Sequence, residues 1–328
     1  MNEPIISVRD LTIRYRTKES TVYAVESVSF DLFPGQVLTL VGESGSGKST
    51  AGMSVLRLLP QEAEVLTGQV MFEGRDLLKL DDRQLRPLRG RRIAMIFQDP
   101  VAGLNPVLSV GSQVAEMITS HLDISKKDAK KRALEILRDV GLSDPERVAK
   151  SYPFQLSGGM CQRVMIGIAT ALNPDVIIAD EPTSALDVTI QAQILYQLDQ
   201  LRKTRGTAIL LITHDFGVVA QMADEVAVMY AGRIVETGGV MQMLKAPLHP
   251  YTHGLLATLP RVDGANEHLR QIPGQPPELF EPAARCPYLP RCSKVMNACR
   301  VGGPPPLETS EERSHPVACY NPIWQAER

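Results

Sequence analysis

The stretch VLTLVGESGSGKST, residues 37–50, decides the fold of this chain. It begins with a nearly continuous apolar run, which is typical of a strand buried on both faces of a parallel sheet. GESGSGKST follows and fits the pattern G-x-x-x-x-G-K-[ST], and the next residues, TAGMSVLRLL, favour a helix. A strand, a glycine-rich loop and a helix in this order predict a phosphate-binding loop.

The chemistry of this loop comes from its backbone and from two side chains. Glycines let backbone N–H groups close around phosphate oxygens without obstruction by Cβ atoms, and the start of the helix adds partial positive charge. Lys48 supplies a positive charge to the β and γ oxygens, and Ser49 offers its hydroxyl to Mg²⁺. The loop therefore indicates a triphosphate ligand.

Composition and charge narrow the class of protein. The chain has 328 residues, of which 44% are hydrophobic and 22% charged, and its net charge is -2. Such a balance is ordinary for a globular protein and argues against a general nucleic-acid binder. The N-terminus lacks the pattern of a secretory signal, and no apolar run approaches the roughly 18 residues of a membrane span. We expect the protein to stay in a reducing cytosol and to act at a membrane only through a partner.

The order of segments favours an α/β fold. IISVRDLTIRY and TVYAVESVSFDL alternate like strands, and residues 106–173 have helical spacing. DVIIAD (175–180) and TAILLIT (207–213) read as buried strands, joined by a helix that ends at Gly206. Strands that alternate with helices predict a largely parallel sheet, with a helical insertion at about residues 100–170.

The segment DVIIADEP predicts the second half of a nucleotide site. Its apolar residues carry Asp180 to the carboxyl end of a central strand, where ligands of such sheets bind. Asp180 can hold Mg²⁺ through water there, and Glu181 is placed to polarise an attacking water.

A second phosphate-seeking helix start appears in LSGGMCQRVMIGIATAL, residues 156–172. One chain needs only one phosphate loop around one triphosphate. We therefore expect Ser157, Gly158 and Gly159 to serve a nucleotide held by another copy.

With these segments in order, the sequence resembles the ATP-binding subunits of ATP-binding-cassette (ABC) transporters over residues from about 8 to 240. The motifs that carry the resemblance are the aromatic Tyr15, the Walker A loop GESGSGKST, the Q-loop residue Gln98, the signature LSGGM, the Walker B strand DVIIADE, the D-loop SALD (184–187) and the switch residue His214. The signature departs from the commonest pattern because Met160 stands where Gln is usual, followed by Cys161, and we expect activity to survive this.

The resemblance implies a P-loop ABC-type nucleotide-binding domain, with a mostly parallel core sheet, an N-terminal antiparallel β subdomain and an inserted helical subdomain. It assigns ATP contacts to Tyr15, Gly42, Glu43, Ser44, Gly45, Ser46, Gly47, Lys48, Ser49, Thr50, Gln98, Asp180 and Asp187 and, across a head-to-tail dimer, to the signature residues Ser157, Gly158 and Gly159. It assigns catalysis to Lys48, Gln98, Glu181 and His214, and Mg²⁺ binding to Ser49, Gln98 and Asp180.

Four of the five cysteines lie in a proline-rich tail, at Cys286, Cys292, Cys299 and Cys319. In a reducing compartment clustered cysteines favour metal binding over disulfides. APLHPYTHGLLATLP (246–260) and the tail resemble the C-terminal extension of oligopeptide/dipeptide importers, a subfamily that includes nickel importers. That resemblance implies a [4Fe–4S] cluster on these four cysteines, while zinc and free or disulfide-linked thiols stay open.

The expected function is that of the ATP-hydrolysing motor subunit of a bacterial ABC importer for di- or oligopeptides. Domains are expected at residues 1–260 for the nucleotide-binding domain and 261–328 for the extension. The resemblance implies a second ATPase subunit, expected to be a paralogue, two permease subunits and a solute-binding protein, at the cytoplasmic face of the plasma membrane. An importer for nickel or another small solute is the alternative, and a non-transport ABC ATPase of DNA repair or translation is a weaker one.

Overall fold

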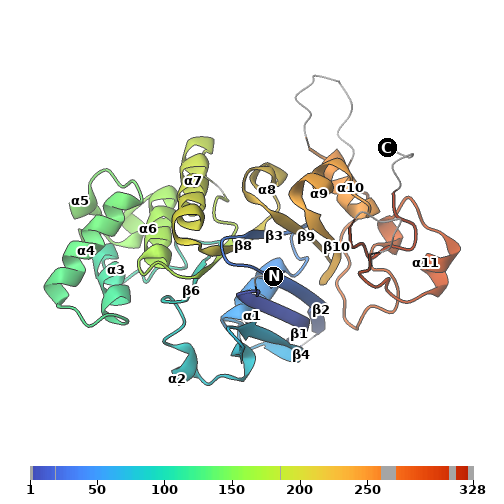
Figure 1. Ribbon diagram of the computed structural model, residues 1–328, viewed down its shortest axis with the longest axis horizontal. Helices are drawn as coiled ribbons and strands as arrows, with labels where there is room; N and C mark the ends of the chain where they lie inside the picture. Colours follow the sequence, from blue (N-terminus) through green and yellow to red (C-terminus); the bar gives the residue numbers. More distant parts are fainter. Residues whose placement is uncertain (1–2, 19, 185, 260–270, 310–314, 324–328) are drawn as a thin grey trace. The chain divides into compact units, whose positions relative to one another are not determined.

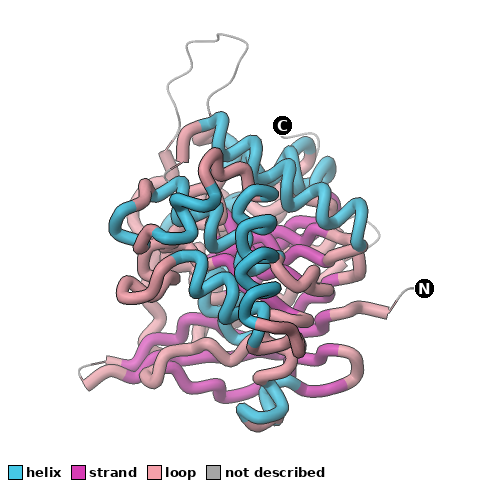
Figure 2. Tube along the Cα trace, turned by 90° about the vertical axis from the view of Figure 1, so that its left-hand side faces the viewer, coloured by secondary structure: helices cyan, strands magenta, loops and turns pink. Residues whose placement is uncertain are grey.

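The computed structural model describes residues 3–18, 20–184, 186–259, 271–309 and 315–323. The chain divides into two compact units, each of which contains helices and strands, coloured by type in Figure 2. The first unit takes the described residues of 1–5, 33–36 and 79–211, and the second takes those of 6–32, 37–78 and 212–328.

The second unit begins with a four-stranded antiparallel sheet in the order β2-β1-β4-β5, of which Figure 1 labels β2, β1 and β4. Its strands are β1 (Ile6–Arg16), β2 (Thr21–Leu32), β4 (Ala63–Phe72) and β5 (Arg75–Asp76). A bulge with φ of 47° at Asp10 shifts the alternation of β1 by one residue. Because of this shift Ile6 and Val8 on one side of the bulge, and Leu11 and Ile13 on the other, are all buried.

The phosphate loop follows a strand of the second unit. This strand, β3 (Val37–Val41), is buried at all five residues and runs parallel to β9 (Glu225–Tyr230), which pairs antiparallel with β10 (Arg233–Gly239). The helices of this unit are α1 (Lys48–Val55), α8 (Phe216–Met222), α9 (Val240–Lys245), α10 (Pro250–Ala257) and α11 (Asn297–Val301), with short 3-10 turns at Leu77–Lys79, at its border with the first unit, and at Leu289–Arg291.

The first unit contains the neighbouring strands β6 (Ile93–Ile96), β7 (Val176–Asp180) and β8 (Ala208–Thr213), although the last two residues of β8 count with the second unit. β6 and β7 are parallel, and every residue of both is buried. This burial on both faces explains why their sequences are continuously apolar. The predicted α/β class with antiparallel and parallel sheets is confirmed.

Helices fill most of the first unit: α2 (Asp82–Leu85), α3 (Val110–Thr119), α4 (Lys126–Asp139), α5 (Pro145–Lys150), α6 (Gly158–Thr170) and α7 (Val188–Arg205), with a 3-10 turn at Pro153–Gln155. Capping residues next to several of these helices determine where the helices begin and end. Ser125, Asp144 and Asp187 cap α4, α5 and α7 with side-chain oxygens, and α7 ends as predicted at Gly206, with φ of 71°. Among the helices that the structure describes, none combines the length and the apolar character that crossing a membrane requires.

The described end of the tail returns to β10 of the second unit. Ala318 donates its backbone N–H to Val235 at 2.8 Å, and Thr237 donates to Pro316 at 3.1 Å. Beside this pairing the carboxylate of Glu236 is fully buried, and His315 Nε2 lies 2.6 Å from its Oε1. It also accepts the N–H groups of Leu248, at 2.6 Å, and His249, at 3.0 Å, so the buried charge is well compensated.

Acid should destabilise the second unit through His249. Burial lowers the pKa of His249 from 6.5 to about 4, although the charge of Glu236 acts in the opposite direction. The unfolded chain therefore binds a proton in this pH window that the folded chain does not. We expect the free energy of unfolding to fall as the pH drops through the window, by up to about 3 kcal/mol.

The control is His249→Asn. His249 Nδ1 accepts the N–H of Tyr251 at 3.0 Å, and Asn can also cap α10 but does not titrate. Urea unfolding at pH 7 and pH 4.5 should show a larger loss of stability in the wild type than in His249→Asn. Equal losses would contradict the assignment.

Candidate nucleotide-binding site

The predicted phosphate loop, residues 42–50, follows β3 and continues into the start of α1 in the second unit. Lys48 opens α1, and only 5% of this residue is exposed. Its ammonium group donates to the backbone carbonyls of Gly42 and Glu43, both at 2.8 Å, and lies 3.3 Å from Ser46 Oγ. The positive charge is therefore held inside the curve of the loop, where the motif predicts it.

Two glycines of the loop are required by close backbone contacts. A Cβ at Gly47 would lie 2.1 Å from the carbonyl oxygen of Ala24, and one at Gly42 would lie 2.2 Å from that of Met229. Gly47 also has φ of 97° and precedes α1 without a side-chain cap on the first turn. The N-cap residue of α1 therefore has no side chain that could occupy the place of a bound anion at the helix start.

Tyr15, the predicted adenine-stacking aromatic, lies next to α1. Its hydroxyl is 3.1 Å from Thr50 Oγ1, at the first turn of the helix. The other tyrosine of this sheet, Tyr23, donates its backbone N–H to the carbonyl of Leu279 at 2.7 Å. Tyr15 is therefore the aromatic hydrogen-bonded to the helix that follows the phosphate loop.

Two of the predicted magnesium ligands, Gln98 and Asp180, lie in the first unit with the predicted water-polarising residue Glu181. The third predicted ligand, Ser49, belongs to the second unit. β6 and β7 are parallel, so their carboxyl ends meet at one edge of the sheet, with Ile96 opposite Ala179. Asp180 ends β7 and is 4% exposed, and the Nε2 of Gln98 lies 3.4 Å from the Oε2 of Glu181. Glu181 has φ of 45°, a left-handed conformation that costs a non-glycine residue about 1–3 kcal/mol and clusters at functional sites.

The signature segment opens α6 in the same unit. Ser157 Oγ accepts the N–H of Met160 at 3.3 Å, while Ser157 and Gly158 are exposed. Cys161 is buried, and burial raises the pKa of its thiol. Sequence reasoning missed Gln162, which is 3% exposed and donates to the carbonyl of Pro182 at 2.7 Å, because a single polar residue in an apolar helix carries no distinctive signal.

The described residues of the predicted D-loop belong to the first unit, whereas the predicted switch residue belongs to the second. Ser184 donates its backbone N–H and its hydroxyl to the carbonyl of Glu181, both at 3.1 Å, and Asp187 caps α7 through Ile190 at 2.9 Å. Ala185, within the same motif, lies outside the described residues. His214 is exposed, directly after β8, and belongs to the second unit.

The four tail cysteines converge in the second unit. All four line one cavity of about 20 Å³. Backbone N–H groups of Lys294 and Asn321 approach the sulfurs of Cys292 and Cys319 at 3.4 and 3.3 Å. No disulfide joins the five cysteines. Within the described ranges, no group of three or more His, Cys, Asp or Glu residues meets the requirements for holding a metal ion.

Burial is the main influence on these thiols. It raises the pKa of Cys286, Cys292 and Cys319, that of Cys319 to about 12, and neighbouring cysteines add to each rise. Without a bound metal ion, Cys286, Cys292 and Cys319 are therefore protonated thiols at neutral pH. A bound cation would reverse that preference.

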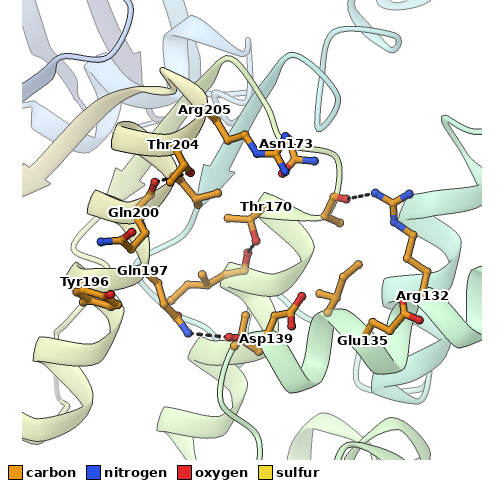
Figure 3. A pocket seen from close by; sticks show the side chains of 15 residues that line it. Arg132, Glu135, Asp139, Thr170, Asn173, Tyr196, Gln197, Gln200, Thr204 and Arg205 are labelled. Atoms are coloured by element: carbon orange, nitrogen blue, oxygen red, sulfur yellow. Dashed lines mark hydrogen bonds between the residues drawn. The ribbon is translucent and has the colours of Figure 1, made fainter.

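A cavity of about 480 Å³ lies elsewhere, between α4, α6 and α7 of the first unit (Figure 3). Gln197 donates to the carbonyl of Asp139 at 3.1 Å across it, and Arg132 donates to that of Ala171 at 3.3 Å. None of the predicted site residues lines this cavity. We therefore assign it no part in the nucleotide chemistry, although it is large.

A buried lysine in a glycine-rich loop and acidic residues at the end of a buried strand define an ATPase of the P-loop class. The chain belongs to the ABC transporter family: residues 25–184 match the family model described as ABC transporter, and residues 235–299 match the one described as Oligopeptide/dipeptide transporter, C-terminal region. It is an ATP-hydrolysing subunit of that family, as predicted.

Similar proteins support this assignment over the whole chain. The dipeptide transport ATP-binding protein DppD of Bacillus subtilis is 46% identical over 99% of this chain and 97% of its own length. A probable peptide ABC transporter ATP-binding protein, y4tR of Sinorhizobium fredii, is 47% identical over 96% and 94%. The solved dimeric structure of the ATP-binding cassette MJ0796 with ADP and phosphate is 31% identical, covers 72% of this chain and 98% of that one, and has a TM-score of 0.65.

The predicted role of Glu181 gives a kinetic expectation. Glu181→Gln removes the carboxylate that would polarise the attacking water but keeps its size. We expect ATP to bind and hydrolysis to slow by at least about a hundredfold, as for loss of a general base. Single-turnover phosphate release measures the effect. Glu146→Gln, at an exposed position on α5, should hydrolyse ATP at the wild-type rate, and a Glu181→Gln rate within about threefold of wild type would contradict the role.

Proposed function

We propose that the chain drives a peptide importer by binding and hydrolysing ATP at the predicted residues. The backbone of residues 42–50 surrounds the phosphates, Lys48 turns from the loop carbonyls toward the β and γ oxygens, and Tyr15 stacks on the base. The observation that carries this assignment is the ammonium of Lys48, buried within hydrogen-bond distance of two loop carbonyls. It keeps a positive charge where a triphosphate would lie.

In the same proposal three residues handle the water and the γ-phosphate. Glu181 accepts the proton of the attacking water, Gln98 orients the Glu181 carboxylate and joins the metal shell, and His214 contacts the γ-phosphate. Ser49 and Asp180 are the other proposed Mg²⁺ ligands, and the ion would neutralise charge on the phosphate oxygens. The contact of 3.4 Å between Gln98 Nε2 and Glu181 Oε2 and the burial of Asp180 support these roles.

The signature residues act on the nucleotide of a second ATPase subunit, which we propose to be a paralogue. Ser157 and Gly158 are exposed at the start of α6, and their N–H groups can therefore reach an external phosphate. Asp187 contributes from the same side of the dimer. A dimeric state is stated for the similar cassette MJ0796.

Peptides are the proposed cargo because relatives named for dipeptide and peptide transport align along nearly the entire chain. We propose two permease subunits and a solute-binding protein as partners, with this chain attached peripherally at the cytoplasmic face of the membrane. Exposed apolar residues in the helical part of the first unit, Val107 at 76% and Phe154 at 70%, offer contact area for permease loops.

The test of the transport role is co-purification. Tagged Glu181→Gln protein, held closed by ATP and Mg²⁺, should retain two multi-span permeases and a second ATPase when membranes are gently solubilised, as identified by mass spectrometry. The associated binding protein should bind short peptides rather than nickel. Recovery of soluble partners alone, or of DNA or ribosomes, would contradict the importer function.

We further propose that Cys286, Cys292, Cys299 and Cys319 hold a [4Fe–4S] cluster. Their convergence on one cavity and the two N–H groups directed at sulfur support a thiolate site. The spacing of Cys286, Cys292 and Cys299, C-x5-C-x6-C, is wider than the C-x2-4-C spacing common at single zinc ions, which favours the cluster over zinc. The cluster would cross-link a tail that has only a small hydrophobic core of its own.

Metal analysis tests this proposal with a matched control. Protein purified without oxygen should contain about four irons and four sulfides per chain and little zinc, as a [4Fe–4S] composition requires. Cys292→Ser should lose iron, whereas Cys161→Ser, at the one cysteine outside the tail, should keep it. Stoichiometric zinc without a brown chromophore would overturn the cluster.

A further inference from the structure

One side chain of the phosphate loop is paired with the tail, 248 positions later in the chain. The carboxylate of Glu43 accepts two hydrogen bonds from the guanidinium of Arg291, at 2.7 Å from Nη1 and 3.0 Å from Nη2. Both residues belong to the second unit. This two-pronged geometry is the strong form of an ion pair and fixes orientation as well as distance.

Arg291 is built into its position. Its side chain is only 4% exposed, and besides the pair with Glu43 it donates to the carbonyls of Pro273, at 2.8 Å, and Gly274, at 3.2 Å. Nη1 also lies 3.4 Å from the hydroxyl of Tyr230, over whose ring the guanidinium sits at 5.7 Å. All three nitrogens are thus engaged, and the hydrogen bonds to Glu43 raise the pKa of Arg291, so its charge is permanent.

Glu43 is held at every polar group it has. Its N–H donates to the hydroxyl of Tyr251 at 2.9 Å, its carbonyl accepts from the Lys48 ammonium at 2.8 Å, and its carboxylate accepts from Arg291. A continuous series of contacts therefore runs from the tail through Glu43 to Lys48.

Arg291, the residue of this contact series that lies in the tail, is also held by the packing of its neighbours. Arg291 closes the 3-10 turn Leu289–Arg291 and directly precedes Cys292. In the same segment Tyr288 packs on Tyr230 and Tyr251, with ring centroids 5.2 and 5.4 Å apart. Displacing Arg291 would therefore disturb a buried aromatic cluster that also supports the loop.

We propose that Arg291 is a positioning residue for ATP, through which the tail sets the shape and the charge of the phosphate loop. The inference rests on the proposed assignment of residues 42–50 to the phosphates of ATP. Arg291 holds Glu43 so that its carbonyl meets Lys48, and it neutralises a carboxylate that would repel a triphosphate bound in the same loop. The tail is then part of the nucleotide-binding machinery.

The charge argument gives a rescue test. Arg291→Ala leaves Glu43 as an uncompensated carboxylate in the loop, and we expect the Kd for MgATP to rise at least about tenfold, with kcat changed less than about threefold. The double variant Arg291→Ala/Glu43→Gln removes both charges and should recover most of the lost affinity. General damage to the fold would not be repaired by a second substitution.

The measurement is fluorescent ATP-analogue binding with full-length protein purified without oxygen, accompanied by iron content and thermal unfolding. Arg300→Ala is the matched control, because Arg300 is exposed and also adjoins a tail cysteine, Cys299. It should bind ATP like the wild type. If Arg291→Ala does not fold, Arg291→Lys, which keeps the charge without the two-pronged contact, should still raise Kd about threefold.

Lys48→Ala separates the two levels of the proposal. Loss of ATP binding in Lys48→Ala together with wild-type affinity in folded Arg291 variants would overturn the role of Arg291 alone. Unchanged binding in Lys48→Ala would overturn the phosphate-loop assignment itself. An Arg291→Ala defect that Glu43→Gln fails to relieve would also overturn the proposal, since the neutralisation of Glu43 would then not be its cause.

Discussion

The contact of the Lys48 ammonium with the carbonyls of Gly42 and Glu43 is the constraint on which the rest of the site depends. This contact bends the loop around a positive charge. The bend requires glycine at positions 42 and 47, because a Cβ atom at either residue would lie within 2.2 Å of a neighbouring backbone carbonyl oxygen. β3, buried at all five residues, fixes one end of the loop, and α1 fixes the other. The proposed binding of phosphates by the loop is based on this geometry.

The proposed catalytic residues are positioned by the ends of parallel strands. β7 delivers Asp180 and Glu181, and β6, beside it, delivers Gln98, so that side chains from distant motifs meet without any special folding of loops. The left-handed backbone of Glu181 stores strain at this edge, and the hydrogen bonds of Ser184 to its carbonyl help to hold it. The second unit adds its own buried polar groups, Glu236 and Arg291, which tie the tail to β10 and to the loop.

The sequence predicts those features of the fold that depend on neighbouring residues in the chain. The order of strand, loop and helix, the buried strands β3 and β7 and the end of α7 at Gly206 all follow from periodicity, glycine placement and motif spacing. The pairs Glu43–Arg291 and Glu236–His315 do not, because their partners are brought together only by the tertiary fold, and a lone charged residue looks like any solvated one. Gln162 could not be predicted either, because its partner, the carbonyl of Pro182, is brought to it only by the tertiary fold. The resemblance to ABC ATPases supplied the roles that spacing alone leaves open.

Hydrogen–deuterium exchange with and without MgATP tests the central claim most directly. If the loop binds the phosphates and the signature serves a partner's nucleotide, ATP should slow exchange at the amides of residues 42–50 and of residues 157–160. Slowing should also reach residues 288–292, because Glu43 is held by Arg291 and Tyr251. Unchanged exchange across residues 42–50 at saturating ATP would contradict the account.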